Sequence, residues 1–108
     1  MAPSVESNTL DMKAIFIAYN QAYNEEIVAL LEQLGQRGYT KWEEVGGRGT
    51  ESGLPHLGNH AWPTQNHALL TVVDNALAPQ IMEALRKTDV DNPLLGLRAY
   101  VLPVEDAL

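Results

Sequence analysis

Apolar residues occur in short runs that alternate with stretches of helical spacing. Lys13 to Tyr19 is a nearly continuous apolar run, which predicts a buried strand. A helix is predicted next, because four apolar residues follow at helical spacing: Ile27, Leu30, Leu31 and Leu34. Asn24 is expected to cap this helix and Gly35 to end it. Tyr39 to Val45 alternates loosely between apolar and polar residues, which indicates a second strand.

The second half of the chain has a similar pattern. His67 to Val73 predicts a third strand, and a helix is expected to open at Ala78 or Pro79 and to run through Lys87. Its inward residues would be Ile81, Ala84 and Leu85, with Arg86 and Lys87 near its negative end. Asp91-Asn92-Pro93 breaks the chain, and Leu97 to Val104 predicts the last strand.

The two halves form an internal repeat. A shift of 54 positions lays Lys13 to Gly35 over His67 to Asp89 without a gap, and the expected strands and helices coincide. The duplicated order predicts an α+β fold of the ferredoxin-like βαββαβ type. Its antiparallel sheet would carry two helices on one face and a long loop between strands 2 and 3.

Both faces of the predicted sheet are apolar. A strand with one face in water should alternate apolar and polar residues. In the first strand Ala14, Phe16 and Ala18 are as apolar as Ile15 and Ile17. Because two helices cover only one face, we expect a second copy of the chain to cover the other.

Length and charge narrow the class of protein. The 108 residues suffice for one domain, which we place at residues 12–108 after a flexible tail at 1–11.

A net charge of -7 argues against binding nucleic acid or anionic lipid. The tail has no signal-peptide pattern, and the chain lacks the apolar run needed for membrane insertion. The cytoplasm is therefore the expected compartment. No cysteine is present, so thiol chemistry is excluded.

The periodic pattern disappears between Gly46 and Asn66. This segment holds five glycines, two prolines, two histidines and a tryptophan. Loops of this length in compact domains are usually functional or disordered. We therefore expect the activity to lie there.

Three kinds of site are conceivable in this loop. Gly47-Arg48-Gly49-Thr50 offers backbone amides and a guanidinium to an anion, or is simply a flexible loop entrance. His56 and His60, with Glu44, have ligand types that suit a divalent transition metal, although most histidine pairs at this spacing bind none. Trp62 is either a partner-binding anchor or a residue that packs the loop on its own domain.

The end of the chain resembles a known family. The segment Tyr100-Val101-Leu102-Pro103-Val104-Glu105-Asp106-Ala107 is similar to the closing strand of the PII signal-transduction proteins. Gly47-Arg48-Gly49, with Gly53 and His56, looks like the base of that family's long T-loop. The resemblance implies a homotrimer whose sheets pack inward. It also implies a ligand cleft between subunits.

The resemblance places a ligand-binding turn before the last strand. The family's Gly-Asp-Gly-Lys turn, which binds ATP or ADP, falls at Leu95-Gly96-Leu97-Arg98. Arg98 keeps the positive charge, whereas leucine replaces both glycines and is expected to hinder close wrapping of a phosphate. The chain also stops before the family's terminal arginines. The chain therefore resembles a divergent PII-like protein. The same architecture is also found in CutA, which is a metal-tolerance trimer.

These observations favour a non-enzymatic sensor. A nucleotide or small anion would bind near Gly47, Arg48, Gly49, Thr50, Gly96 and Arg98, and the ordered loop would control a transporter or metabolic enzyme. One alternative is a CutA-like metal-binding protein that uses His56, His60 and Glu44. Another is a small ferredoxin-like enzyme with an intersubunit pocket. Thr50 or Ser52 with a loop histidine supplies the residue types of a hydrolase, but no nucleophile elbow.

Overall fold

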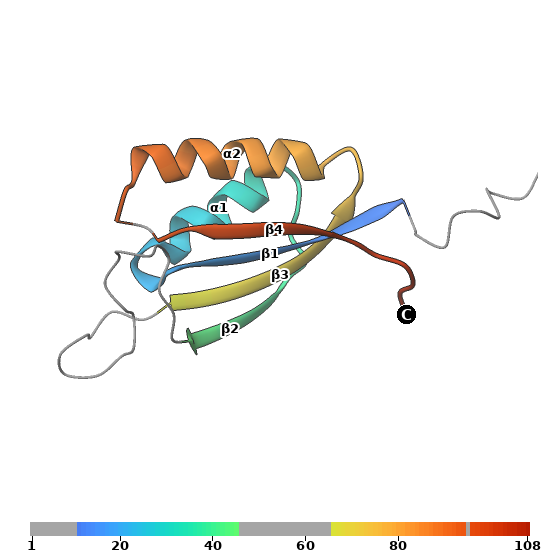
Figure 1. The fold of residues 1–108 in the computed structure, drawn as a ribbon, viewed down its shortest axis with the longest axis horizontal. Helices are drawn as coiled ribbons and strands as arrows, with labels where there is room; N and C mark the ends of the chain where they lie inside the picture. The colour runs from blue at the N-terminus through green and yellow to red at the C-terminus, as the bar shows by residue number, and fades with distance from the viewer. Residues whose placement is uncertain (1–10, 46–65, 95) are drawn as a thin grey trace, which may run out of the picture.

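The computed structural model describes residues 11–45, 66–94 and 96–108. In chain order the elements are β1 (Met12–Asn20), the short 3-10 helix η1 (Gln21–Tyr23), α1 (Asn24–Gln33), β2 (Thr40–Val45), β3 (Asn66–Asp74), α2 (Ala78–Asp91) and β4 (Arg98–Pro103). The strands form one antiparallel sheet in the order β2-β3-β1-β4, and both helices lie on one face of it (Figure 1). The ferredoxin-like α+β prediction is confirmed. Neither described helix is long and apolar enough to cross a membrane.

The internal repeat is visible in the structure. A shift of 54 positions carries Met12–Asn20 onto Asn66–Asp74, which are the observed bounds of β1 and β3. The same shift carries the first residue of α1 onto the first residue of α2. It also carries the buried Ile27 of α1 onto the buried Ile81 of α2. The two βα units are therefore built alike.

The core lies between the helices and one face of the sheet. Alternate side chains of β1 point into it, and Ile15, Ile17 and Tyr19 have no exposed surface. The helices and the neighbouring elements contribute the other buried apolar residues, namely Ile27, Leu31, Leu69, Val73, Ala78, Ile81, Leu85 and Leu97. This alternation is the expected result of a strand whose successive side chains point to opposite faces.

Thr71 of β3 is a polar residue inside this core. Its hydroxyl donates to the carbonyl oxygen of Gly38 at 2.6 Å and accepts from Nε2 of Gln36 at 2.7 Å. Gln36 follows directly after Gly35, whose φ of +87° lies in the left-handed region that glycine adopts without strain. The predicted stop of α1 at Gly35 is thus confirmed, and Thr71 ties the connection between α1 and β2 to the sheet.

Two expectations about the helix ends are wrong. Asn24 does not cap α1, because the chain first forms η1, which is capped by the side chain of Asn20. The helix α2 runs to Asp91, so its last turn contains no basic residue, and Arg86 and Lys87 lie further from its end. Acidic residues near a helix C-terminus are electrostatically unfavourable, which is why the charge pattern suggested an earlier end.

In the described part of the chain, the second face of the sheet carries no helix and is apolar. We call it the open sheet face. On it Phe16 of β1 pairs with Leu70 of β3 and with Tyr100 of β4. The large apolar side chains Trp42, Val72, Tyr100 and Leu102 are 45%, 39%, 56% and 49% exposed. The prediction of an uncovered apolar face is confirmed for the single chain, and its cover by a second copy remains a prediction.

Candidate ligand-binding site

The predicted site residues divide into two groups. Gly47, Arg48, Gly49 and Thr50, together with His56, His60 and Trp62, fall outside the described residues. Glu44, Gly96 and Arg98 are described. The geometry of the site therefore comes from the turn before β4 and from the two strands that lead into and out of segment 46–65.

The turn before β4 presents a cation that has no ion-pair partner in the described part of the chain. Gly96 has a φ of +64°, in the left-handed region, and Arg98 begins β4 as an exposed residue. Nη1 of Arg98 donates to the carbonyl oxygen of Leu97 at 2.8 Å, and its guanidinium forms no ion pair within residues 11–45, 66–94 and 96–108. Leu97 itself is 6% exposed and belongs to the core. Its side chain therefore points inward, away from the outer side of the turn.

Arg98 lies at the same end of the sheet as both ends of the long loop. It pairs with Ala18 of β1, which in turn pairs with Ala68 of β3. Val45 and Asn66, from which segment 46–65 starts and returns, pair with each other at this end (Figure 1). Two strands therefore lie between β2 and β4. At about 4.8 Å per strand, the sheet itself keeps Arg98 apart from the loop ends.

A polar network that the sequence did not reveal lies at this end of the sheet. The hydroxyl of Tyr19 donates to Oδ1 of Asn24 at 2.6 Å, and Nδ1 of His67 lies 3.3 Å from the same oxygen. Because an amide oxygen only accepts hydrogen bonds, a hydrogen bond between these two atoms requires the tautomer of His67 with its proton on Nδ1. The rings of Tyr19 and His67 also meet edge to face, with centroids 6.0 Å apart. The network fixes the start of α1 against the first residues of β3.

One signal in the sequence could have revealed this network. Tyr19 falls on the buried phase of β1, two residues after Ile17. A buried tyrosine hydroxyl almost always has a hydrogen-bond partner. Burial, and then the negative charge that Tyr39 and Glu43 would place nearby, raises the pKa of Tyr19 to about 12. The hydroxyl therefore remains a donor at every physiological pH.

Replacing Tyr19 with phenylalanine is expected to change how stability depends on pH. At pH 8, Tyr19→Phe removes a buried hydrogen bond and lowers the free energy of unfolding by about 1 to 2 kcal/mol. Wild-type stability is fully present below pH 10, where tyrosine ionises in the unfolded chain, and falls as the pH rises towards 12. Phenylalanine cannot ionise, so the difference between the two proteins should shrink above pH 10. Urea unfolding at several pH values measures it.

Tyr23→Phe is the matched control for this comparison, because Tyr23 of η1 is only partly buried and packs on the core side of the sheet, away from the open sheet face. Its difference from the wild type should vary less with pH than that of Tyr19→Phe. If the two variants had the same pH dependence, the assigned role of Tyr19 would be wrong. Protein concentration is held constant, since self-association also contributes to apparent stability.

The metal-binding residues are not assembled in the described part of the chain. Glu44 is exposed at an irregularity in β2 and has a φ of +59°. Within the three described ranges, no group of three His, Cys, Asp or Glu side chains could hold a metal ion. His56 and His60, on which this hypothesis depends, lie outside those ranges.

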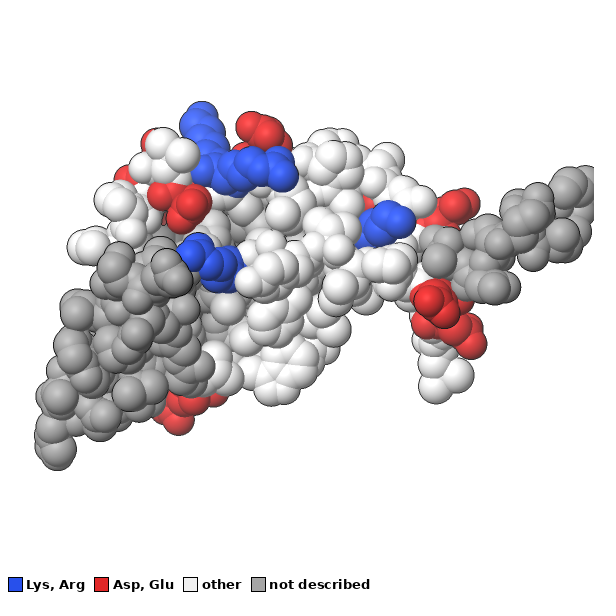
Figure 2. Space-filling view, in the orientation of Figure 1, with Lys and Arg blue, Asp and Glu red and all other residues white. Residues whose placement is uncertain are grey.

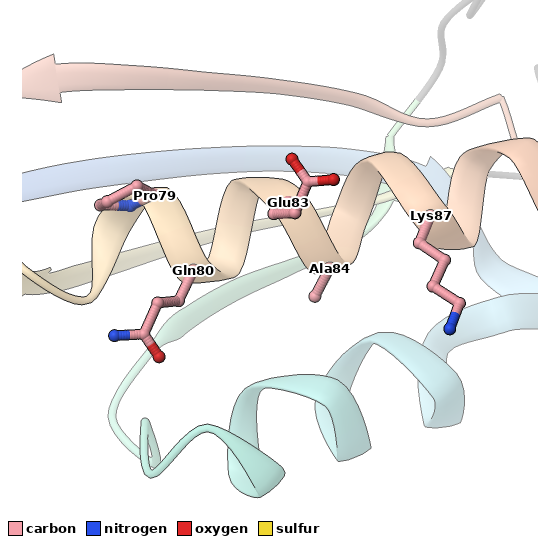
Figure 3. A pocket seen from close by; sticks show the side chains of 5 residues that line it. All are labelled: Pro79, Gln80, Glu83, Ala84 and Lys87. Atoms are coloured by element: carbon pink, nitrogen blue, oxygen red, sulfur yellow. The ribbon is translucent and has the colours of Figure 1, made fainter.

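Among the described residues, two hollows on the helix side of the molecule are considered as ligand sites. The larger, of about 520 Å³, is lined by Pro79, Gln80, Glu83, Ala84 and Lys87, all from α2 (Figure 3). Gln80, Ala84 and Lys87 point from α2 towards α1 in this view. Ala84 is therefore half-buried in a groove rather than in the core, contrary to the expectation from its spacing. The smaller hollow lies between α2 and the sheet.

The comparison with known families decides the identity of the fold. The family model of nitrogen regulatory protein P-II matches residues 12–108. The chain belongs to the P-II family. The predicted resemblance to the PII family is thereby confirmed. No curated protein matches this P-II family member.

Solved structures agree with this family assignment. A PII-like signalling protein from Thermus thermophilus is 26% identical, with a TM-score of 0.63 over 88% of this chain and 91% of its own. CPII from Thiomonas intermedia, bound to ADP, AMP and bicarbonate, is 17% identical, with a TM-score of 0.69 over 86% of this chain and 91% of its own. PII from Arabidopsis thaliana, bound to citrate, is 14% identical, with a TM-score of 0.65 over 91% of this chain and 79% of its own.

Proposed function

We propose that this P-II family member is a non-enzymatic regulatory protein of the cytoplasm. It forms a homotrimer and senses an adenine nucleotide or another small anion in the cleft between neighbouring subunits. The ligand contacts Gly47, Arg48, Gly49, Thr50, Gly96 and Arg98. The loop that contains His56, His60 and Trp62 then controls a partner protein, either a transporter or a metabolic enzyme.

The position of Arg98 carries this proposal. It is an exposed guanidinium without a carboxylate partner in the described ranges, at the loop end of the edge strand β4. Guanidinium groups at such positions bind carboxylates and phosphates through paired hydrogen bonds. Val45, from which the loop starts, is separated from β4 by both β3 and β1, whereas Asn66, to which it returns, is separated from β4 by β1. We assign the second wall of the site to the loop of a neighbouring subunit.

The ligands of related proteins support the chemical class. CPII is bound to ADP, AMP and bicarbonate, and the plant PII is bound to citrate. All of these ligands are anions. An anion that contacts both the turn at Gly96 and the loop at Arg48 stabilises only those loop conformations in which both contacts form. It therefore shifts the loop population, and a partner that binds one loop conformation responds to the ligand.

Calorimetric titration with ADP, AMP, bicarbonate and citrate tests the proposal, with uncharged adenosine as the control. We expect at least one anion to bind saturably, and adenosine to bind more weakly than ADP. Absence of binding by all four anions would contradict the proposal. Tight binding of zinc, lost in a His56→Ala, His60→Ala double variant, would instead favour the CutA-like alternative.

A further inference from the structure

A second hollow lies at the opposite end of the sheet from Arg98. It has a volume of about 300 Å³ and lies where the first turns of α2 pass over the helix side of β1 and β4. Seven residues line it, namely Lys13, Asn75, Ala78, Pro79, Met82, Arg86 and Val101. Lys13 pairs with Pro103, the last residue of β4, whereas Arg98 is the first. Val101, in the middle of β4, is the lining residue nearest to Arg98 along this strand, and neither Gly96 nor Arg98 lines the hollow.

The charged residues that line the hollow are basic, although the chain as a whole is acidic. Of the 108 residues, seven are Lys or Arg and fourteen are Asp or Glu. Two of the cations, Lys13 and Arg86, line this hollow, and no carboxylate of the described ranges does. Asn75 adds an amide that can donate. In a chain with a net charge of -7, this local excess of positive charge favours an anion.

The two cations are available to a ligand. Lys13 forms no ion pair within the described ranges. Within the described ranges, the ion pair of Arg86 is with Glu83 at 3.4 Å, and both side chains are well exposed at 65% and 78%. Exposed ion pairs of this kind contribute little free energy because water screens them. The guanidinium can therefore turn to an incoming carboxylate at little cost.

The remaining walls of the hollow are apolar. Val101 lies opposite Ile15 on the helix side of the sheet and remains 39% exposed, because α2 does not cover the edge strand completely. Met82 and Ala78 of α2 form the facing wall. Figure 2 shows uncharged surface between the Lys and Arg side chains over α2 and those beside the start of β1. A ligand with an apolar body would gain by covering this surface.

We infer that this hollow is a second ligand site, which binds a small organic carboxylate with an apolar body. The carboxylate lies between Lys13 and Arg86, and the apolar body contacts Met82 and Val101. A volume of about 300 Å³ is at the lower end for ligand pockets, which favours a short aliphatic or single-ring acid. The hollow opens on the helix side, so a ligand bound there would not contact the open sheet face.

Phenylacetate is a suitable probe, with phenylacetamide as its uncharged match. In protein whose methionine methyl groups are labelled with carbon-13, Met82 reports on the hollow that it lines, whereas Met12, the other methionine in the described ranges, does not line it. We expect phenylacetate to shift the Met82 methyl signal saturably, and phenylacetamide to bind much more weakly. Lys13→Gln and Arg86→Gln should each weaken phenylacetate about tenfold, the usual effect of losing a hydrogen bond to a charged group.

Arg37→Gln is the matched control, because Arg37 does not line the hollow. This variant should bind phenylacetate like the wild type. Arg98→Gln serves only to distinguish this hollow from the candidate intersubunit site. Equal binding of the amide, an unchanged affinity in Lys13→Gln, or the absence of a saturable Met82 shift would overturn the inference. Loss of binding in Arg98→Gln alone would place the probe in the intersubunit site, which contradicts this inference and leaves the proposed function intact.

Discussion

Tyr100→Lys is expected to convert the assembled protein into single chains of 11.9 kDa. Tyr100 lies opposite Phe16 on the open sheet face and is 56% exposed in the single chain. Lysine is therefore tolerated in the isolated fold. At the interface between copies, however, the same change removes about 2 kcal/mol of apolar burial per copy and places a charge against apolar surface.

Light scattering at micromolar concentration measures this change. The wild type should have the mass of three chains and the variant the mass of one. Val90→Lys is the matched control, because Val90 is a large apolar residue, 79% exposed, on α2 rather than on the open sheet face. That variant should remain assembled. A wild-type protein of one chain, or dissociation of Val90→Lys as well, would show that the open sheet face does not mediate self-association.

Arg98→Gln is expected to weaken binding of the anionic ligand by about ten- to a hundredfold, because a guanidinium contributes charge and paired hydrogen bonds that an amide cannot replace. Arg98 is exposed, and among the described residues its side chain donates a hydrogen bond only to the carbonyl of Leu97, so the fold should be unaffected. Arg48→Ala is expected to prevent the ligand from ordering segment 46–65. Calorimetry measures the first effect, and hydrogen exchange of the segment with and without ligand measures the second.

Arg37→Gln serves as the control for both measurements. Arg37 is an exposed cation between α1 and β2, and its replacement changes the net charge by the same amount. It should bind ligand like the wild type. If Arg37→Gln weakened binding as much as Arg98→Gln, the effect would be one of overall charge. If Arg98→Gln bound normally, the turn before β4 would not be part of the site.

The repeat made most of the fold predictable from the sequence. The apolar runs of β1 and β3 are 54 positions apart, and each is followed by a helix whose buried residues share one spacing. Patterning also indicated that Phe16 and its neighbours would lie on an uncovered sheet face. Such signals are periodic along the chain, so a single sequence is enough to detect them.

Contacts between distant residues were not predictable in this way. His67 meets Asn24 because the strands and α1 bring them together across 43 positions, and no local pattern marks such a pair. Asn24 fits the preferences of a helix cap equally well. Leu97 appeared to obstruct the turn before β4, whereas the structure places its side chain in the core. The direction of a side chain in a turn depends on its neighbours in space, which the sequence does not reveal.

Native mass spectrometry tests most directly whether the ligand site lies between subunits. The protein is measured with whichever of ADP, AMP, bicarbonate and citrate binds most tightly in calorimetry, beside Tyr100→Lys and Arg98→Gln. We expect three chains with up to three ligands for the wild type, three chains without ligand for Arg98→Gln, and single chains without ligand for Tyr100→Lys. Single chains of Tyr100→Lys that bound the ligand as tightly as the wild type would contradict an intersubunit site.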